Sequence, residues 1–267
     1  MHELERVREQ LAPIADQLAG ALIAVDFDGT LAPIVQRPED AVALPDAVAA
    51  LRDLAPRVGC LAVITGRPVE FVAHQLTLDT QPFPVVLRGA YGREHWQNGE
   101  VRQPPPPDEV RAAAADLAAL LATAPAGVLL EDKGSGVAVH TRQAVDPAGA
   151  LGLLDEPVRA VAARHGLHVE PGRYVLEVRP FGIDKGTALL DLVREHQPQA
   201  VLFVGDDLGD LAAFEVVEQL RERGLAGVTV CAGSAEVPTL AERADLVVDG
   251  PAGVAVLLSE LVRLAAG

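Results

Sequence analysis

The aspartates Asp26 and Asp28 constrain the fold most, because they directly follow the apolar run Ala21–Val25. That run has the length and the β-branched content of a buried strand. Two carboxylates at the end of such a strand are costly unless their charge is compensated, and Mg²⁺ compensates it because it prefers oxygen ligands. Gly29 allows a sharp turn whose N–H groups can face a phosphate. The segment therefore predicts a metal and phosphate site, although a strand followed by a plain Asp-Gly turn is the simpler alternative.

Strand-length apolar runs alternate with helical segments in the first and last parts of the chain. Such runs occur at residues 21–25, 60–64, 85–87, 201–204, 227–231 and 246–248. The alternation predicts an α/β fold with a Rossmann-like parallel sheet. Aromatic residues make up only 3% of the chain, so Val, Leu, Ile and Ala must build the core. A helix predicted over residues 3–19 should break at Pro13, and Asn98-Gly99 predicts a small hairpin.

Four consecutive prolines at positions 104–107 predict a stiff linker and a domain boundary. The pattern after them changes to helix, two strands, helix, two strands. This order predicts a small antiparallel sheet covered by two helices on one face, with its other face free. We therefore expect an inserted α+β domain at residues 104–180, which interrupts a core formed by residues 1–103 and 181–267.

The composition excludes several kinds of partner. The formal net charge of −16 argues against nucleic acids and anionic membranes, because both require basic surfaces. The sequence contains no apolar run as long as a membrane span and no signal-peptide core, so we expect a soluble cytoplasmic protein. Cys60 and Cys231 lie in apolar runs and should be buried free thiols. We expect a small-molecule substrate, and we favour a monomer, although the sequence does not determine the oligomeric state.

Lysine is rare in this chain: Lys133 and Lys185 are the two lysines among 22 basic residues. In a sequence that favours arginine so strongly, a retained lysine indicates a position that needs a compact ammonium group. Chance retention is the alternative.

Four polar segments fall where parallel strands end or where the next helix begins: residues 26–28, 65–66, 184–186 and 205–210. Ligands of open parallel sheets bind at these carboxyl ends. Together the segments supply a carboxylate nucleophile, a hydroxyl, an ammonium and a second group of carboxylates. This set meets the needs of phosphoryl transfer, which depends on positioning and on neutralising charge. Each segment alone is also consistent with ordinary helix capping.

The same segments resemble, in order and over the whole chain, the four motifs of the haloacid dehalogenase-like phosphatases, and the insert resembles their C2-type cap domain. More specifically, the chain resembles the trehalose-6-phosphate phosphatase family. The matching segments are DFDGTLAPIV (26–35), TGR (65–67), EDKG (131–134), VHTR (139–142), LEVRP (176–180), DKG (184–186) and FVGDD (203–207).

The resemblance implies a role for each core motif. Asp26 would attack phosphorus and form a transient aspartyl phosphate, and Asp28 would protonate the leaving oxygen and later activate water. Thr65 and Lys185 would hold the phosphoryl oxygens. The implied Mg²⁺ ligands are Asp26, the backbone carbonyl of Asp28, and Asp206, with Asp207 and Asp210 in support.

The resemblance also implies residues that bind the substrate: Gly66, Arg67, Glu131, Lys133, His140, Arg142, Glu177 and Arg179. A solvated polar face is the simpler alternative for those in the insert. The chain departs from the family at Gly209 and Leu211, where Thr and Glu are usual. Losing this hydroxyl and this carboxylate beside the metal predicts altered metal affinity with activity retained.

These observations predict a Mg²⁺-dependent phosphatase that acts on trehalose 6-phosphate. The alternatives are a phosphatase for sucrose 6-phosphate, glucosylglycerol phosphate or mannosyl-3-phosphoglycerate, a sugar phosphomutase, or a non-catalytic pseudo-phosphatase with a binding or regulatory role.

Overall fold

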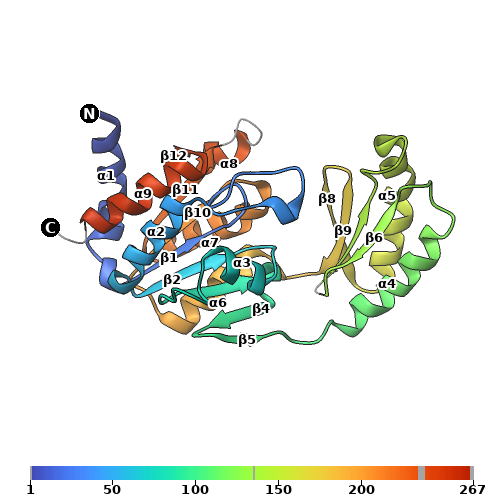
Figure 1. The fold of residues 1–267 in the computed structure, drawn as a ribbon, viewed down its shortest axis with the longest axis horizontal. Helices are drawn as coiled ribbons and strands as arrows, with labels where there is room; N and C mark the ends of the chain where they lie inside the picture. Colours follow the sequence, from blue (N-terminus) through green and yellow to red (C-terminus); the bar gives the residue numbers. More distant parts are fainter. Residues whose placement is uncertain (1, 135, 234–237, 265–267) are drawn as a thin grey trace. The chain divides into compact units, whose positions relative to one another are not determined.

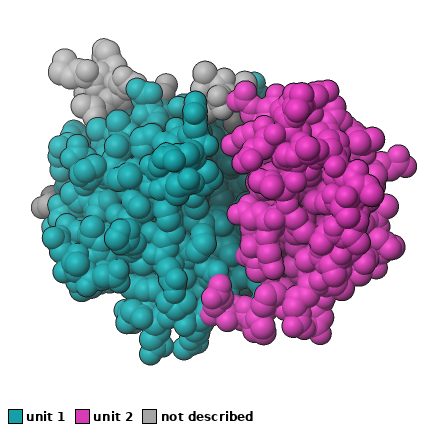
Figure 2. Space-filling model, turned by 45° about the vertical axis from the view of Figure 1, so that its right-hand side comes forward, with its two compact units in different colours: residues 1–102, 184–267 teal, residues 103–183 magenta. Residues whose placement is uncertain are grey.

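The structure is a computed structural model that describes residues 2–134, 136–233 and 238–264. The chain divides into two compact units (Figure 2). The core unit comprises residues 1–102 and 184–267, and the insert unit comprises residues 103–183. Each unit has its own sheet and its own apolar core.

The core unit contains one sheet with the strand order β12-β11-β10-β1-β2-β3-β4-β5 (Figure 1). Its strands are β1 (Ala21–Val25), β2 (Cys60–Ile64), β3 (Val86–Gly89), β4 (Glu94–Gln97), β5 (Glu100–Arg102), β10 (Ala200–Gly205), β11 (Ala226–Gly233) and β12 (Leu246–Asp249). Neighbours from β12 to β3 pair in parallel. The predicted parallel sheet is therefore confirmed, and the hairpin of β4 and β5 extends it in antiparallel pairing.

Helices cover both faces of this sheet because successive strand residues alternate between two apolar clusters. Ile23 and Val25 of β1 pack in one cluster, while Leu22 and Ala24 pack in the other. The first cluster includes residues of α1 (His2–Ala15), α2 (Pro45–Leu54), α3 (Val69–Gln75) and α9 (Gly250–Leu264). The second includes residues of α6 (Lys185–His196), α7 (Leu211–Glu222) and α8 (Pro238–Arg243). The short helices η1 (Leu18–Gly20), η2 (Pro38–Asp40), η3 (Ala55–Arg57), η4 (Ala90–Gly92) and η5 (Leu208–Asp210) lie in the connections.

The predicted break of the first helix at Pro13 is wrong, because α1 continues through Pro13 to Ala15. Pro13 lies in the last turn of the helix, where a missing N–H removes few hydrogen bonds. The fully buried side chains of Leu11 and Ile14, which flank it, hold this turn in the core.

The insert unit is an antiparallel sheet covered by two helices, as predicted. The strand order is β6-β7-β9-β8, with β6 (Leu129–Asp132), β7 (Val137–His140), β8 (Leu167–Gly172) and β9 (Val175–Pro180). Val137, Val139, Leu176 and Val178 pack against apolar residues of α4 (Asp108–Leu121) and α5 (Pro147–Arg164). Strand alternation therefore places Glu131, Ala138, Glu177 and Glu170, which are register partners, on the opposite face.

Two further sequence predictions concern single features. Cys60 and Cys231 are buried free thiols, as predicted. Among the described residues, no helix combines the length and the apolar character needed to cross a membrane.

Candidate active site

The parallel register of the core sheet brings three polar strand ends to one edge. Val25 of β1 pairs with Val204 of β10 and with Val63 of β2. Asp26 continues this ladder, because its N–H donates to the carbonyl of Val204 at 2.8 Å. Parallel pairing therefore places Asp26 between the polar segments that follow β10 and β2.

Three buried carboxylates meet there. Asp26, Asp206 and Asp210 each offer one oxygen, and these oxygens lie within 4.8 Å of one another. Gly29 makes this approach possible: its φ is +73°, and a Cβ at this position would overlap the carboxylate of Asp206. The absence of a side chain at Gly29 thus both allows the turn that the sequence predicts and leaves room for the Asp206 carboxylate.

Lys185, the first residue of α6, lies among these carboxylates. Its Nζ is 3.0 Å from Asp26 Oδ2, 2.7 Å from Asp210 Oδ1 and 3.9 Å from Asp207 Oδ1. Asp184 begins the helix by accepting the N–H of Thr187, which directs Lys185 into the first turn. One of the two lysines therefore occupies a buried site that suits a compact point charge.

The cluster carries more negative than positive charge, and the pKa values reflect this. Burial raises the pKa of Asp26 well above its usual range, and Asp210 and Asp206 raise it further although Lys185 opposes them. Burial, Asp207 and Asp210 raise the pKa of Asp206 to about 8. Burial acts to lower the pKa of Lys185, but Asp210 and Asp26 outweigh it and the pKa is raised.

This excess of negative charge is what a divalent cation would neutralise. The carboxylate oxygens of Asp26 and Asp206 are hard ligands of the kind that Mg²⁺ prefers. Asp210 is differently engaged, because its Oδ1 accepts from Lys185 and its Oδ2 accepts the N–H groups of Asp206 and Asp207. The donor set therefore fits a metal held by Asp26 and Asp206, with Asp210 orienting the groups around it.

Asp28 makes a two-pronged ion pair with Arg67. Arg67 Nε lies 2.7 Å from Asp28 Oδ2, and its Nη2 lies 2.7 Å from Asp28 Oδ1. The third guanidinium nitrogen donates to the carbonyl of Pro38 at 2.8 Å, and the group stacks over Phe71. The hydrogen bonds that Arg67 donates to Asp28 raise the pKa of Arg67. The sequence predicts a substrate contact for Arg67 but not this contact, which fixes the direction of the Asp28 carboxylate.

Thr65 is buried at the end of β2 and is 1% exposed. Its hydroxyl accepts the N–H of Arg67 at 3.1 Å, and its own N–H donates to the carbonyl of Arg88 at 2.9 Å. Gly66 follows it, with no room for a Cβ beneath the ring of Tyr91. The hydroxyl that the sequence predicts for phosphate binding thus accepts a hydrogen bond within its own loop, while β3 holds the backbone of Thr65.

The departures at positions 209 and 211 leave the cluster intact. The N–H of Gly209 donates to Asp207 Oδ1 at 2.9 Å, so the backbone supports this carboxylate. Leu211 packs against the apolar cluster of α6 and α7. Asp207 itself is largely exposed, whereas Asp210 is fully buried.

In the insert unit, the predicted residues pair mainly with one another. Lys133 Nζ is 3.2 Å from Glu177 Oε2, and His140 Nε2 is 2.7 Å from Glu131 Oε2. Arg179 forms an ion pair with Glu170, and Arg142 is exposed. Glu131 and Glu177 share the polar face of the sheet through their common partner Ala138. Glu170, which is not among the residues predicted from the sequence, lies in the same row, as the register partner of Glu177.

Comparison with known proteins adds the family context. The profile of the family described as Trehalose-phosphatase matches residues 24–249. A trehalose-phosphate phosphatase of Mycobacterium bovis is 35% identical over 270 residues, which cover 95% of this chain and 65% of that protein. The chain thus spans less than two thirds of the length of such curated relatives.

Solved structures share the fold. The C-terminal domain of a Candida albicans trehalose-6-phosphate phosphatase matches with a TM-score of 0.75 at 21% identity, covering 96% of each chain. The C-terminal domain of a Candida albicans trehalose synthase regulatory protein matches with a TM-score of 0.66 at 17% identity, covering 91% of this chain and 93% of that one. Proteins named for catalysis and for regulation thus share this fold, so the fold alone does not distinguish the two roles.

Proposed function

Because this chain belongs to the trehalose-phosphatase family, we propose that it is a phosphatase that hydrolyses trehalose 6-phosphate to trehalose and phosphate. The observation that carries the proposal is the buried carboxylate of Asp26, 3.0 Å from Lys185 and beside Asp206, at the end of β1. A nucleophile, a cation and a metal-binding carboxylate converge there, as phosphoryl transfer requires.

In the first step an oxygen of Asp26 attacks phosphorus, a bond forms between them, and the bond from phosphorus to the sugar oxygen breaks. Asp28 gives its proton to the leaving sugar oxygen. In the second step Asp28 takes a proton from water, whose oxygen attacks phosphorus and releases Asp26 and inorganic phosphate. Both oxygens of Asp28 accept from Arg67 in the structure, so one of these hydrogen bonds must open for Asp28 to carry the proton, while the other keeps the carboxyl group oriented for both transfers.

Thr65 and Lys185 bind the phosphoryl oxygens. The Lys185 ammonium offsets negative charge that the carboxylates would otherwise direct at the incoming phosphate. Asp210 keeps this ammonium in place through its bond to Nζ. We assign the metal to Asp26, Asp206 and the backbone carbonyl of Asp28, with Asp207 and Asp210 in support. Mg²⁺ supplies further neutralisation of the phosphoryl oxygens when it is bound.

Recognition of the sugar belongs in this proposal to the insert unit. Glu131, Lys133, His140, Arg142, Glu177 and Arg179 carry charged donors and acceptors that suit vicinal hydroxyls. Two of the ion pairs among them are partly exposed, so a sugar hydroxyl can replace a protein partner at low cost.

A panel of phosphate esters tests the proposal. Release of phosphate is measured from trehalose 6-phosphate, sucrose 6-phosphate, glucosylglycerol phosphate, mannosyl-3-phosphoglycerate and an aryl phosphate, with Mg²⁺ and with chelator. We expect the highest kcat/KM for trehalose 6-phosphate and loss of activity with chelator. A higher kcat/KM for another sugar phosphate would make that ester the substrate in place of trehalose 6-phosphate. No turnover of any ester, together with retained binding of trehalose 6-phosphate, would favour a regulatory pseudo-phosphatase.

A further inference from the structure

The loop that carries Thr65 is held from one side by the segment that follows β3. Thr65 N–H donates to the carbonyl of Arg88 at 2.9 Å, and Tyr91 N–H donates to the carbonyl of Thr65 at 3.0 Å. Ala90 N–H donates to the carbonyl of Arg67, also at 3.0 Å. Both backbone groups of Thr65 are therefore bonded to one short segment.

This segment has an unusual backbone. Ala90 and Tyr91 have φ values of +46° and +58°, a left-handed conformation that is uncommon outside glycine. Non-glycine residues persist in it where their surroundings hold them, often near functional sites. Here the conformation turns two successive N–H groups toward the Thr65 loop. The ring of Tyr91 also lies against Gly66, where a Cβ would be 2.9 Å from its Cζ.

The other side of the same segment packs on α6, the helix that begins with Lys185. Gly92 has a φ of +95°, and a Cβ there would lie 2.7 Å from the Cβ of Ala188. Ala188 is less than one helical turn from Lys185. The contact leaves no space for a side chain between the turn and the helix.

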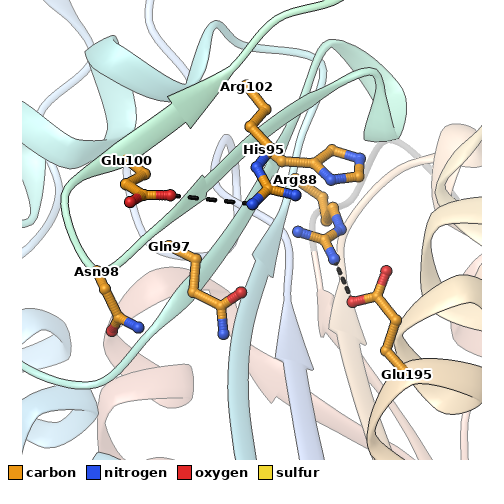
Figure 3. A pocket seen from close by; sticks show the side chains of 7 residues that line it. All are labelled: Arg88, His95, Gln97, Asn98, Glu100, Arg102 and Glu195. Carbon is orange, nitrogen blue, oxygen red and sulfur yellow. Dashed lines mark hydrogen bonds and ion pairs between the residues drawn. The ribbon is translucent and has the colours of Figure 1, made fainter.

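An ion pair and a hydrogen bond also hold residues 88–92 in place. Arg88 is 3% exposed and its Nη2 lies 2.6 Å from Glu195 Oε2 of α6 (Figure 3). His95 Nε2 donates to the carbonyl of Gly92 at 2.9 Å. These side chains line a cavity of about 410 Å³, on which Gln97 and Asn98 also border.

We propose that residues 88–92 form a positioning element that sets the distance between Thr65 and Lys185. This inference rests on the proposed function, in which these two side chains hold the phosphoryl group. The segment contacts the Thr65 loop through its amides and contacts α6 through Gly92 and Arg88. A shift of either contact would change how well the two groups fit one phosphate, and displacements of about 1 Å can reduce rates on the order of 100-fold.

Gly92→Ala tests this role, with Gly99→Ala as the matched control. Both glycines have positive φ, +95° and +83°, so alanine strains the backbone similarly at the two positions. Apart from its two chain neighbours, a methyl group at Gly99 would meet no atom of the described residues within 4 Å, whereas one at Gly92 would meet Ala188. The control therefore carries the strain without displacing α6.

We expect Gly92→Ala to lower kcat/KM about 10-fold or more relative to Gly99→Ala. The inhibition constants of orthovanadate and inorganic phosphate should rise in the same variant, because it should bind the phosphoryl group less tightly. The double variant Gly92→Ala/Ala188→Gly, which removes the opposing Cβ, should recover most of the loss. Melting temperatures of all variants show whether each is folded under assay conditions.

Equal kinetic constants and equal orthovanadate inhibition for folded Gly92→Ala and Gly99→Ala would overturn the positioning role. A loss that Ala188→Gly does not restore at all would also count against it. Wild-type protein that fails to hydrolyse any ester would instead refute the proposed function. In that case binding of inorganic phosphate, measured by calorimetry, still compares the two glycine variants.

Discussion

The charged groups of the core unit and those of the insert unit are arranged in opposite ways. In the core, three buried carboxylates lie together and two of them, Asp26 and Asp210, contact one ammonium, so negative charge is in excess. In the insert, Lys133 pairs with Glu177 and His140 pairs with Glu131, and most of these side chains are partly exposed. One cluster is buried and unbalanced, and the other is accessible and paired.

The difference indicates what each cluster is suited to do. Buried excess charge is costly and persists where a cation or a reaction uses it. Exposed ion pairs contribute little to stability and exchange their partners readily. We therefore expect chemistry to depend on the core residues and discrimination among substrates to depend on the insert residues.

The largest effect should come from Asp26→Asn. An amide is a poor nucleophile and a poor Mg²⁺ ligand, so kcat should fall on the order of 10⁴-fold or more. Asp53→Asn, at an exposed position of α2, is the control and should retain full activity. Substantial Mg²⁺-dependent turnover by Asp26→Asn, measured as phosphate release, would refute the nucleophile assignment.

Substituting the two lysines compares the core unit with the insert unit directly, because each unit contains one of them. Lys185→Met should lower kcat/KM for every phosphate ester by about 10³-fold, and it should destabilise the metal-free protein because three carboxylates lose their cation. Lys133→Met should lower kcat/KM for the sugar phosphate by about 10-fold and leave aryl phosphate hydrolysis unchanged. If Lys185→Met and Lys133→Met lowered kcat/KM for an aryl phosphate equally, the proposed difference between the two clusters would be refuted.

Glu177→Gln tests whether the polar face of the insert sheet recognises the sugar. A hydrogen bond to a charged group is worth roughly 1.5–3 kcal/mol, which corresponds to about 10- to 100-fold in kcat/KM. The ratio of kcat/KM for trehalose 6-phosphate to that for an aryl phosphate should fall accordingly. Glu156→Gln, on the exposed side of α5, is the control. A ratio that Glu177→Gln leaves unchanged would exclude Glu177 from sugar recognition.

The smallest expected effect is the pH dependence of stability. Burial raises the pKa of Asp206 to about 8, so the folded protein keeps a proton that the unfolded chain loses near pH 4. The unfolding free energy of the metal-free protein should therefore fall as pH rises toward 8, by at most about 1.4 kcal/mol per pH unit for this proton.

Thermal unfolding between pH 6 and pH 8.5, with EDTA and with saturating Mg²⁺, measures this slope. Mg²⁺ should flatten it, because the metal favours the ionised carboxylate. Asp206→Asn should flatten it as well, since the amide does not titrate. A slope that is the same in wild type and Asp206→Asn would show that another group controls the pH dependence.

Much of the core was predictable because it depends on neighbours along the chain. The apolar run before Asp26, the Asp-Gly turn and the alternation of strands with helices are local patterns. Parallel strands align their carboxyl ends, so the convergence of Asp26 and Asp206 follows once the sheet is predicted. The two-layer insert follows in the same way from the order of its helices and strands.

Contacts between distant parts of the chain set how the polar side chains pair. Arg67 binds Asp28 across 39 positions of sequence separation, although the sequence offers Arg67 other carboxylates and a substrate role. The left-handed conformation of Ala90 and Tyr91 is likewise not predictable from these residues, because neither prefers it. Strand and turn patterns follow from short-range preferences, whereas pairing of long polar side chains depends on how whole helices and strands pack. Local patterns along the chain thus predict which polar groups meet at the sheet edge, whereas packing sets how each one is held.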